Sequence, residues 1–321
     1  MRQTKVRSMV EGGLLAGIAI IFALISAYLP IVGPFVNLLW PVPIILLGVR
    51  HGYKWSIMAT VVSGLIIAML IHPLQAVGVV VGFGLIGIVV GYAFRMEFSP
   101  AKTMFWGTIA SILSKAALLG IGMAVTGINP FVMQGEVMTK AMEQGIEVYR
   151  NFGIAEEELT KMKDSMQAVF EIVKVILPAG FIMASILDTF LNFLIAKKVL
   201  KKLGHHIGDF PPFKNWSVPG YTVYFFALSL VMIYWGDSRQ ITLLYQLGMN
   251  LQVITSSVLL VQGLALFYYF VDKYNLSRAV KGIILVLILI NGFMSQVLIF
   301  AGAIDIILDY RRLRTPDKKE E

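Results

Sequence analysis

Long runs of apolar residues, separated by short polar stretches, repeat along the whole chain. A helix that crosses a bilayer needs about 20 mostly apolar residues. Nine runs approach or exceed this length, and they cover residues 10–29, 31–49, 54–72, 74–94, 103–126, 170–196, 218–236, 241–271 and 279–308. The pattern predicts an all-α, polytopic membrane protein with about 8–10 transmembrane segments.

Composition indicates the same class. Of the 321 residues, 57% are apolar and only 14% are charged, whereas about 25% are charged in an average soluble domain. So few charges cannot cover the surface of a soluble enzyme of this length. Cysteine is absent, which excludes disulfides, thiolate catalysis and cysteine metal ligands.

Two of the nine runs are irregular. The second contains Pro34, Pro41 and Pro43, so we expect a kinked segment that packs against protein rather than lipid. The last run, 279–308, contains Asn291-Gly292, which is a turn signal. We therefore expect this run to turn back on itself, as two short helices or as a re-entrant hairpin.

The distribution of Lys and Arg predicts the orientation in the membrane, because these residues favour cytoplasmic segments. They gather in the N-terminal tail, in alternate loops, in segment 197–214 and in the C-terminal tail. We expect a cytoplasmic N-terminus, and a cytoplasmic C-terminus if the last run turns back. The net charge of +8 is then a topology signal and does not indicate a nucleic-acid partner.

Residues 127–168 form a hydrophilic loop on the opposite side. Asn129-Pro130 is a good helix start, and Asn151 to Gly153 ends that helix. A second start at Glu156 suits a helix N-terminus, and we expect this helix to continue into the run at 170. The two amphipathic helices are interpreted either as a hairpin extending the flanking spans or as a methionine-rich lid over an outward cavity.

Polar residues inside the apolar runs are candidate substrate-binding residues, because ionisable groups at membrane depth are costly. Lys115 lies near the middle of the fifth run, and Asp188 lies in the sixth with Asn192 one turn further on. The helix rise brings Lys115 within reach of Asp188, as a substrate site or as a structural ion pair. Asn250 in the eighth run is a further candidate, or a residue that bonds between helices.

The sequence lacks the motifs of the common catalytic and nucleotide sites. The four histidines have no metal-site spacing, and there is no Walker loop or serine nucleophile elbow. The glycine-rich stretch 78–91 lies inside an apolar run, which favours close helix packing over nucleotide binding. We therefore expect no enzyme activity, no metal and no cofactor, and a transporter of this kind needs a partner or an ion gradient for energy.

The first run carries small residues at four-residue spacing, which is typical of a face that packs closely against another helix. These residues are Gly13, Gly17, Ala19 and Ala23. The spacing resembles the first helix of the substrate-binding S components of energy-coupling factor (ECF) transporters. The resemblance implies that this face contacts a transmembrane coupling subunit, which is served by separate ATPases.

A closer resemblance covers nearly the whole chain. The proline-aromatic stretch and the acidic-basic end resemble the YybS-like family of Gram-positive bacterial membrane proteins, which is thought to be related to S components. The residues that carry it are Pro211, Pro212, Phe213, Trp216, Asp305, Asp309 and Arg311. It implies a bacterial plasma membrane location, an S-component-like six-helix core over residues 1–200, and additional helices with a basic tail over 201–321.

Two functions fit these observations. The first is a transport-related subunit that binds a small molecule and lacks its own ATPase. The second is a non-transport membrane scaffold that organises partners in envelope growth or sporulation through the cytoplasmic segment 197–217. Both imply contact with the lipid bilayer, and neither implies a nucleic-acid partner.

Overall fold

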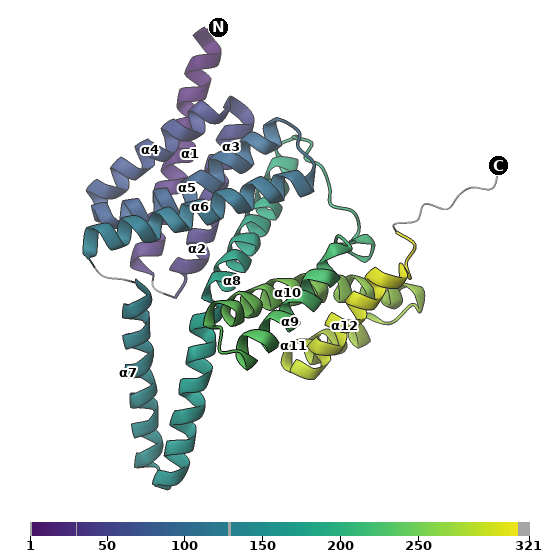
Figure 1. The fold of residues 1–321 in the computed structure, drawn as a ribbon. Coiled ribbons are helices and arrows are strands. Elements are labelled where there is room, and N and C mark those ends of the chain that lie inside the picture. The colour runs from purple at the N-terminus through teal and green to yellow at the C-terminus, as the bar shows by residue number, and fades with distance from the viewer. Residues whose placement is uncertain (1, 30, 128–129, 314–321) are drawn as a thin grey trace, which may run out of the picture. The chain divides into compact units, whose positions relative to one another are not determined.

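The computed structural model describes residues 2–29, 31–127 and 130–313. These residues form α-helices and one short 3-10 turn, with no β-strand among them (Figure 1). The first eight helices are α1 (Arg2–Tyr28), α2 (Gly33–Leu39), α3 (Pro41–His51), α4 (Tyr53–Leu70), α5 (Pro73–Arg95), α6 (Pro100–Thr126), α7 (Pro130–Asn151) and α8 (Glu156–Lys202). After the 3-10 turn η1 (Phe213–Asn215) follow α9 (Tyr221–Ser238), α10 (Thr242–Lys273), α11 (Arg278–Ile290) and α12 (Gly292–Leu308).

The chain divides into two compact units. The first comprises the described residues of Met1–Gln167 and Phe181–Asp209, and the second those of Ala168–Gly180 and Phe210–Glu321. Helix α8 contributes to both units, since its 47 residues extend over about 70 Å. The expected division into 1–200 and 201–321 rests on the resemblance to S components and stays a prediction.

The structure confirms the all-helical, polytopic class. Within the described residues, six helical segments are long and apolar enough to cross a membrane: Val6–Tyr28, Tyr53–Leu70, Pro73–Arg95, Pro100–Thr126, Glu156–Lys202 and Thr242–Lys273. The bent pair α11 and α12 makes seven if it forms one span. The nine apolar runs exceed this number because 31–49 is broken into α2 and α3, and because the 18-residue α9 is rich in tyrosine.

Helix α5 lies at the centre of the first unit and packs against α3, α4 and α6 (Figure 1). Its glycines allow this close approach. A Cβ at Gly87 would lie 2.9 Å from Ile44 Cβ, and one at Gly91 would lie 3.0 Å from the Ile45 carbonyl oxygen. Stretch 78–91 is therefore a helix-packing surface.

Prolines start several helices in this unit. Pro41, Pro73 and Pro100 each stand in the first turn, where the missing N–H has no intrahelical partner to lose. Ser99 caps α6 by accepting a hydrogen bond from the Lys102 N–H. The expected irregular second segment is thus a helix restart at Pro41, following the short helix α2.

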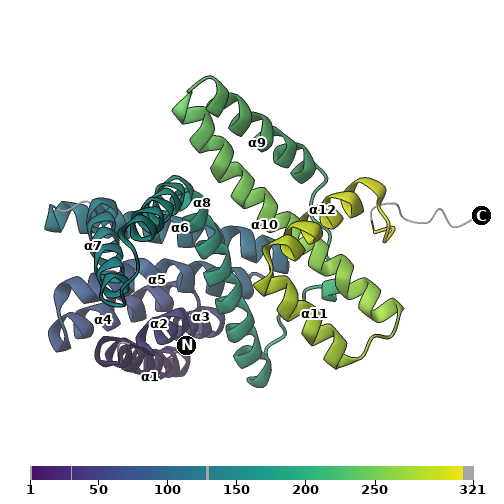
Figure 2. The same cartoon turned by 90° about the horizontal axis from the view of Figure 1, so that it is seen from below.

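Helix α10 is the centre of the second unit, and it packs against α9 and α12 (Figure 2). The core between them consists of Phe226, Leu259, Ile299, Ala303 and Ile306. The segments Ala279–Ile288 and Gly292–Leu308 meet at 101°. Asn291 ends α11 and caps α12 by accepting the Phe293 N–H at 2.9 Å, so the break falls where the sequence predicts a turn.

The hydrophilic segment 127–168 contains the two helices that the sequence predicts. Helix α7 begins at Pro130 and ends at Asn151, and α8 begins at Glu156 and continues without a stop to Lys202. An ion pair between Arg150 Nε and Glu156 Oε1, at 2.7 Å, spans the turn that joins them. The expected start residue Asn129 lies outside the described residues, and the lid interpretation stays a prediction.

Candidate functional site

The candidate site lies in the first unit, where α6 and α8 approach closely. Small and hydroxyl-bearing residues form the buried face of α6. A Cβ added at Gly107 would lie 2.5 Å from Thr189 Cγ2, so glycine is needed there for α8 to approach. Ser111, one turn after Gly107, consequently lies beside Asp188.

The structure brings Lys115, Asp188 and Asn192 together. Lys115 Nζ lies 2.9 Å from Asp188 Oδ2 and also hydrogen-bonds Ser111 Oγ. The Ser111 hydroxyl donates to the same carboxylate oxygen at 3.1 Å. Asn192 Nδ2 donates to Asp188 Oδ1 at 3.0 Å. Both carboxylate oxygens are therefore satisfied, and the pair that the sequence left open is formed.

The two charges of this site differ in accessibility. The Asp188 side chain is 4% exposed, whereas the Lys115 side chain is 23% exposed. Two further polar atoms, Asn192 Oδ1 and Ser114 Oγ, are buried and have no hydrogen-bond partner among the described residues. Buried polar atoms without a partner are rare in native proteins. The carboxylate is thus shielded from solvent, and the Lys115 ammonium is the accessible member of the pair.

Asn250 has different partners, in the second unit. Its Oδ1 accepts the backbone N–H of Ala179 at 2.8 Å, and its Nδ2 donates to the carbonyls of Val175 at 2.7 Å and Gln246 at 2.8 Å. The first two bonds fix α10 to α8 next to Pro178, which lies inside α8, whereas the bond to Gln246 stays within α10. The structural interpretation of Asn250 accounts for its amide fully.

The small residues of α1 divide into two sets. Ala19 and Ala23 are 0% and 2% exposed, so they already pack against helices of their own unit. Gly13 and Gly17 are open, since a Cβ at either position would have no described atom within 4 Å. Only the two glycines of the expected packing face remain available to a partner.

Motif residues from both ends of segment 201–321 meet around one guanidinium group. The Arg311 and Asp305 side chains are 1% and 2% exposed and form an ion pair with Nη2 and Oδ2 2.8 Å apart. Arg311 also donates to the Trp216 carbonyl at 2.8 Å and to the Lys214 carbonyl. Gln262 completes the cluster by donating to Asp305 Oδ2 at 2.6 Å.

The other motif residues support this cluster. Trp216 Nε1 donates to the Pro211 carbonyl at 2.9 Å, and the Phe213 ring lies 5.0 Å from the Trp216 ring. The Pro212 carbonyl accepts the Asn215 N–H at 2.7 Å. Asp309 follows α12 and accepts the Leu313 N–H at 3.0 Å. The motif thus holds the segment before α9 to the end of α12.

Two groups of residues were missed by reasoning from the sequence. Gln262 stands inside the apolar run of α10, and its polarity at that depth was the available signal. The second group consists of Glu11 and its ion-pair partners Arg7, Arg50 and His51. The available signal was an acidic residue next to a basic tail. Within the described residues, no three His, Asp or Glu side chains are placed to hold a metal ion.

These helices and the buried ion pair define a multi-pass membrane protein. The family described as “Predicted membrane protein (DUF2232)” matches residues 17–306, and the chain belongs to this family. The chain is also similar to “Uncharacterized protein YybS” of Bacillus subtilis (strain 168), with 26% identity over 318 residues, which are 96% of this chain and 97% of that protein. The expected resemblance to YybS-like membrane proteins is confirmed. No solved structure matches this chain.

Proposed function

We propose that this protein is a small-molecule-binding subunit of a membrane transporter, similar to an ECF S component and without an ATPase of its own. The observation that carries the proposal is the Lys115–Asp188 ion pair between apolar helices of the first unit. Ionisable residues at membrane depth are expensive and commonly mark substrate or ion pathways.

The geometry favours an anionic or strongly polar ligand at Lys115. The ammonium is the more exposed member of the pair, and a buried hydroxyl without a described partner, Ser114 Oγ, stands one residue before it in α6. A ligand carboxylate bound to Lys115 would compete with Asp188 for the same donor. Substrate binding would then loosen the contact that holds α6 to α8.

A thermal-shift screen of the purified protein with small metabolites tests this proposal, because a ligand that binds the folded state raises its stability. We expect a stabilising ligand whose effect is lost in Lys115→Met. Lys140→Met, at an exposed position of α7, is the matched control and should keep the effect. Shifts that survive in Lys115→Met would contradict the site, and a screen without any shift would contradict ligand binding.

The coupling partner is proposed to contact α1 at Gly13 and Gly17, which are open in the structure. Gly13→Leu and Gly17→Leu should abolish co-purification of a membrane coupling subunit and its ATPases while leaving the fold intact. Gly120→Leu, at another open glycine, is the control. Co-purification of cell-wall or division proteins instead would favour the scaffold function.

The orientation is proposed from the basic segments: N-terminus in the cytoplasm of a bacterial cell and the α7–α8 turn outside. The absence of cysteine makes single-cysteine labelling direct. A cysteine in place of Ile154 should react with an impermeant maleimide in intact cells, and one in place of His206 should react only after lysis. The reverse labelling pattern would overturn this orientation.

A further inference from the structure

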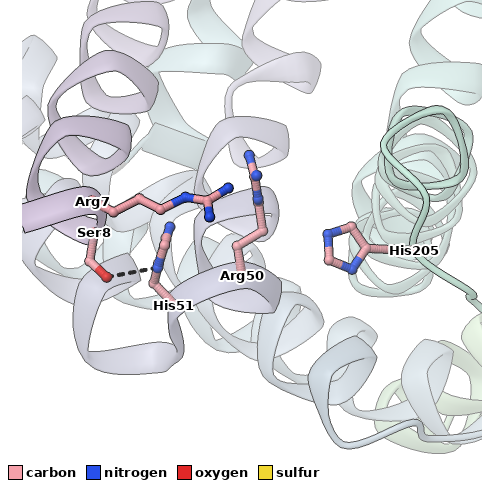
Figure 3. A pocket seen from close by; sticks show the side chains of 5 residues that line it. All are labelled: Arg7, Ser8, Arg50, His51 and His205. Carbon is pink, nitrogen blue, oxygen red and sulfur yellow. Dashed lines mark hydrogen bonds between the residues drawn. The ribbon is translucent and has the colours of Figure 1, made fainter. Parts of the chain in front are cut away.

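A pocket lies in the first unit, and neither Lys115 nor Asp188 is part of its lining. It has a volume of about 450 Å³, and basic residues dominate its lining. Figure 3 shows Arg7, Ser8 and His51 on one side, His205 on the other, and Arg50 between them. These residues come from the first turns of α1, the last turn of α3 and the segment that follows α8.

One carboxylate, that of Glu11, forms ion pairs with three of the basic residues that line this pocket. Glu11 Oε1 lies 3.1 Å from Arg7 Nε, and Glu11 Oε2 lies 3.1 Å from Arg50 Nη1 and 2.7 Å from His51 Nε2. Both guanidinium groups are permanently charged, so a single negative charge faces two positive charges. The pocket keeps a surplus positive charge even when its histidines are neutral.

Several donors in the pocket remain unused. Each arginine binds Glu11 through one nitrogen, which leaves its other N–H groups for another acceptor. The His205 imidazole has no hydrogen bond or ion pair to any described residue. The Ser8 hydroxyl lies 2.7 Å from His51 Nδ1 and orients that ring. Donors from three chain segments therefore surround one space.

Helix electrostatics accounts for only part of this arrangement. Arg50 and His51 lie in the last turn of α3, where positive charge interacts favourably with the helix dipole. That effect does not require Arg7 or His205 to face the same space. It also does not require a pocket of this size beside them.

We propose that this pocket binds a phosphate-bearing anion. Guanidinium groups match phosphate oxygens in geometry and charge. The pocket lies where the apolar part of α1 begins at Val6 and where α3 ends at His51. This is the polar boundary of the helices, where basic pockets between transmembrane helices bind lipid headgroups. The phosphate belongs either to an anionic phospholipid or to a soluble compound, and the proposal is independent of the transport function.

Thermal unfolding of the full-length, delipidated protein in detergent tests the proposal with three probes: phosphatidylglycerol, phosphatidylcholine and inorganic phosphate. We expect phosphatidylglycerol, phosphate or both to raise the unfolding temperature, and phosphatidylcholine to have no such effect. Stabilisation by phosphatidylglycerol alone identifies a lipid headgroup. Stabilisation by phosphate as well identifies a site open to soluble anions.

Variants connect the effect to the pocket. Arg50→Gln and His205→Gln should each raise the apparent Kd of the stabilising probe about tenfold, as expected for one lost hydrogen bond to a charged group. Lys54→Gln removes a nearby exposed charge outside the pocket and should leave the Kd unchanged. If Arg50→Gln unfolds the protein, His205→Gln still tests the proposal. The His205 side chain bonds no other described residue, so its replacement should leave the fold intact.

Three results would overturn the proposal. The first is that neither phosphatidylglycerol nor phosphate stabilises the protein. The second is that phosphatidylcholine stabilises it equally. The third is that Lys54→Gln weakens binding as much as His205→Gln does, since the effect would then follow general surface charge.

Discussion

The side-chain oxygen of Asn250 accepts the backbone N–H of Ala179 at 2.8 Å, inside a helix that ordinarily satisfies its own backbone. In a regular α-helix that N–H bonds to the carbonyl of Val175, four residues earlier. Here the Asn250 amide lies between the two groups and also donates to the Val175 carbonyl at 2.7 Å. The neighbouring Pro178 removes a further helical hydrogen bond, so Asn250 repairs a weakened turn of α8.

Replacing Asn250 with leucine should destabilise the protein by several kcal/mol. It leaves the Ala179 N–H and the Val175 carbonyl unpaired, at about 1–3 kcal/mol for each buried group. Thermal unfolding in detergent measures the loss. Gln252→Leu, one half-turn along the same helix, is the control and should change the unfolding temperature little. Equal effects of the two variants would show that Asn250 has no special role.

The Lys115–Asp188 pair should show strong coupling in a double-mutant cycle. Lys115→Met leaves the Asp188 carboxylate buried and uncompensated, and breaking a buried pair costs about 3–5 kcal/mol, less here because Lys115 is 23% exposed. Lys115→Met combined with Asp188→Asn should recover part of that loss. The free energy of unfolding of the four proteins gives the coupling.

The exposed pair Lys161–Glu157, with side chains 72% and 81% exposed, provides the comparison for this cycle. Exposed pairs of this kind contribute about 0.3–0.5 kcal/mol. A coupling free energy between Lys115 and Asp188 that is no larger than the one between Lys161 and Glu157 would contradict a functional or structural ion pair in the membrane.

Features set by local sequence were predictable. The break at Asn291-Gly292 and the helix start at Glu156 follow from turn chemistry and helix-end electrostatics, and both occur as expected. The contact between Lys115 and Asp188 could be predicted from the helix rise alone, because both residues lie in apolar runs that follow each other in the chain. Such arguments need only one helix, or two consecutive apolar runs.

Features set by the register between distant helices were not predictable. Asn250 bonds the backbone N–H of Ala179, and the apolar side chain of Ala179 gives no signal in the sequence that relates the two residues. The small residues of α1 show the same limit: Ala19 is buried and Gly13 is open, although both are small and apolar. Which side of a helix meets its neighbour depends on packing that one sequence does not reveal.

Two glycines of α5 should respond in opposite ways to the same substitution. Gly91→Ala places a methyl group 3.0 Å from the Ile45 carbonyl oxygen, so α3 must shift, and such overpacking costs about 1–3 kcal/mol. The methyl group added in Gly78→Ala would have no described atom within 4 Å, and this substitution gains up to about 1 kcal/mol of helix propensity. Unfolding temperatures that change in the same direction would contradict the packing of α5 on α3.

Arg311 should be essential for the stability of the second unit. Arg311→Gln leaves the buried Asp305 carboxylate without its cation, at a cost of about 3–5 kcal/mol. Arg311→Lys should also fail, because an ammonium cannot reproduce the forked contacts to Asp305 and the Trp216 carbonyl. Arg312→Asn is the control, since Arg312 has a φ of 50° that asparagine tolerates. Proteolysis of 210–313 measures the effect, and resistance retained in Arg311→Gln would contradict it.

The segment after α8 should loosen at acid pH. A hydrogen bond from the Lys197 ammonium, assisted by its charge, holds the pKa of Asp209 below its usual value of 3.8. A carboxylate with a lowered pKa stabilises the folded segment fully above the usual pKa, and this stabilisation is lost as the pH falls through the lowered value. We therefore expect residues 203–209 to stay ordered at neutral pH and to loosen below about pH 4.

Hydrogen exchange of the 203–209 backbone, corrected for the intrinsic rate at each pH, measures this loosening. Asp209→Asn imitates the protonated carboxyl, so at pH 7 it should already show the faster exchange that the unmodified protein shows only in acid. Asp164→Asn, at an exposed position of α8, removes the same charge elsewhere and should exchange normally. Unchanged exchange in Asp209→Asn would mean that Asp209 does not hold the segment, and the acid transition would then need another titrating group.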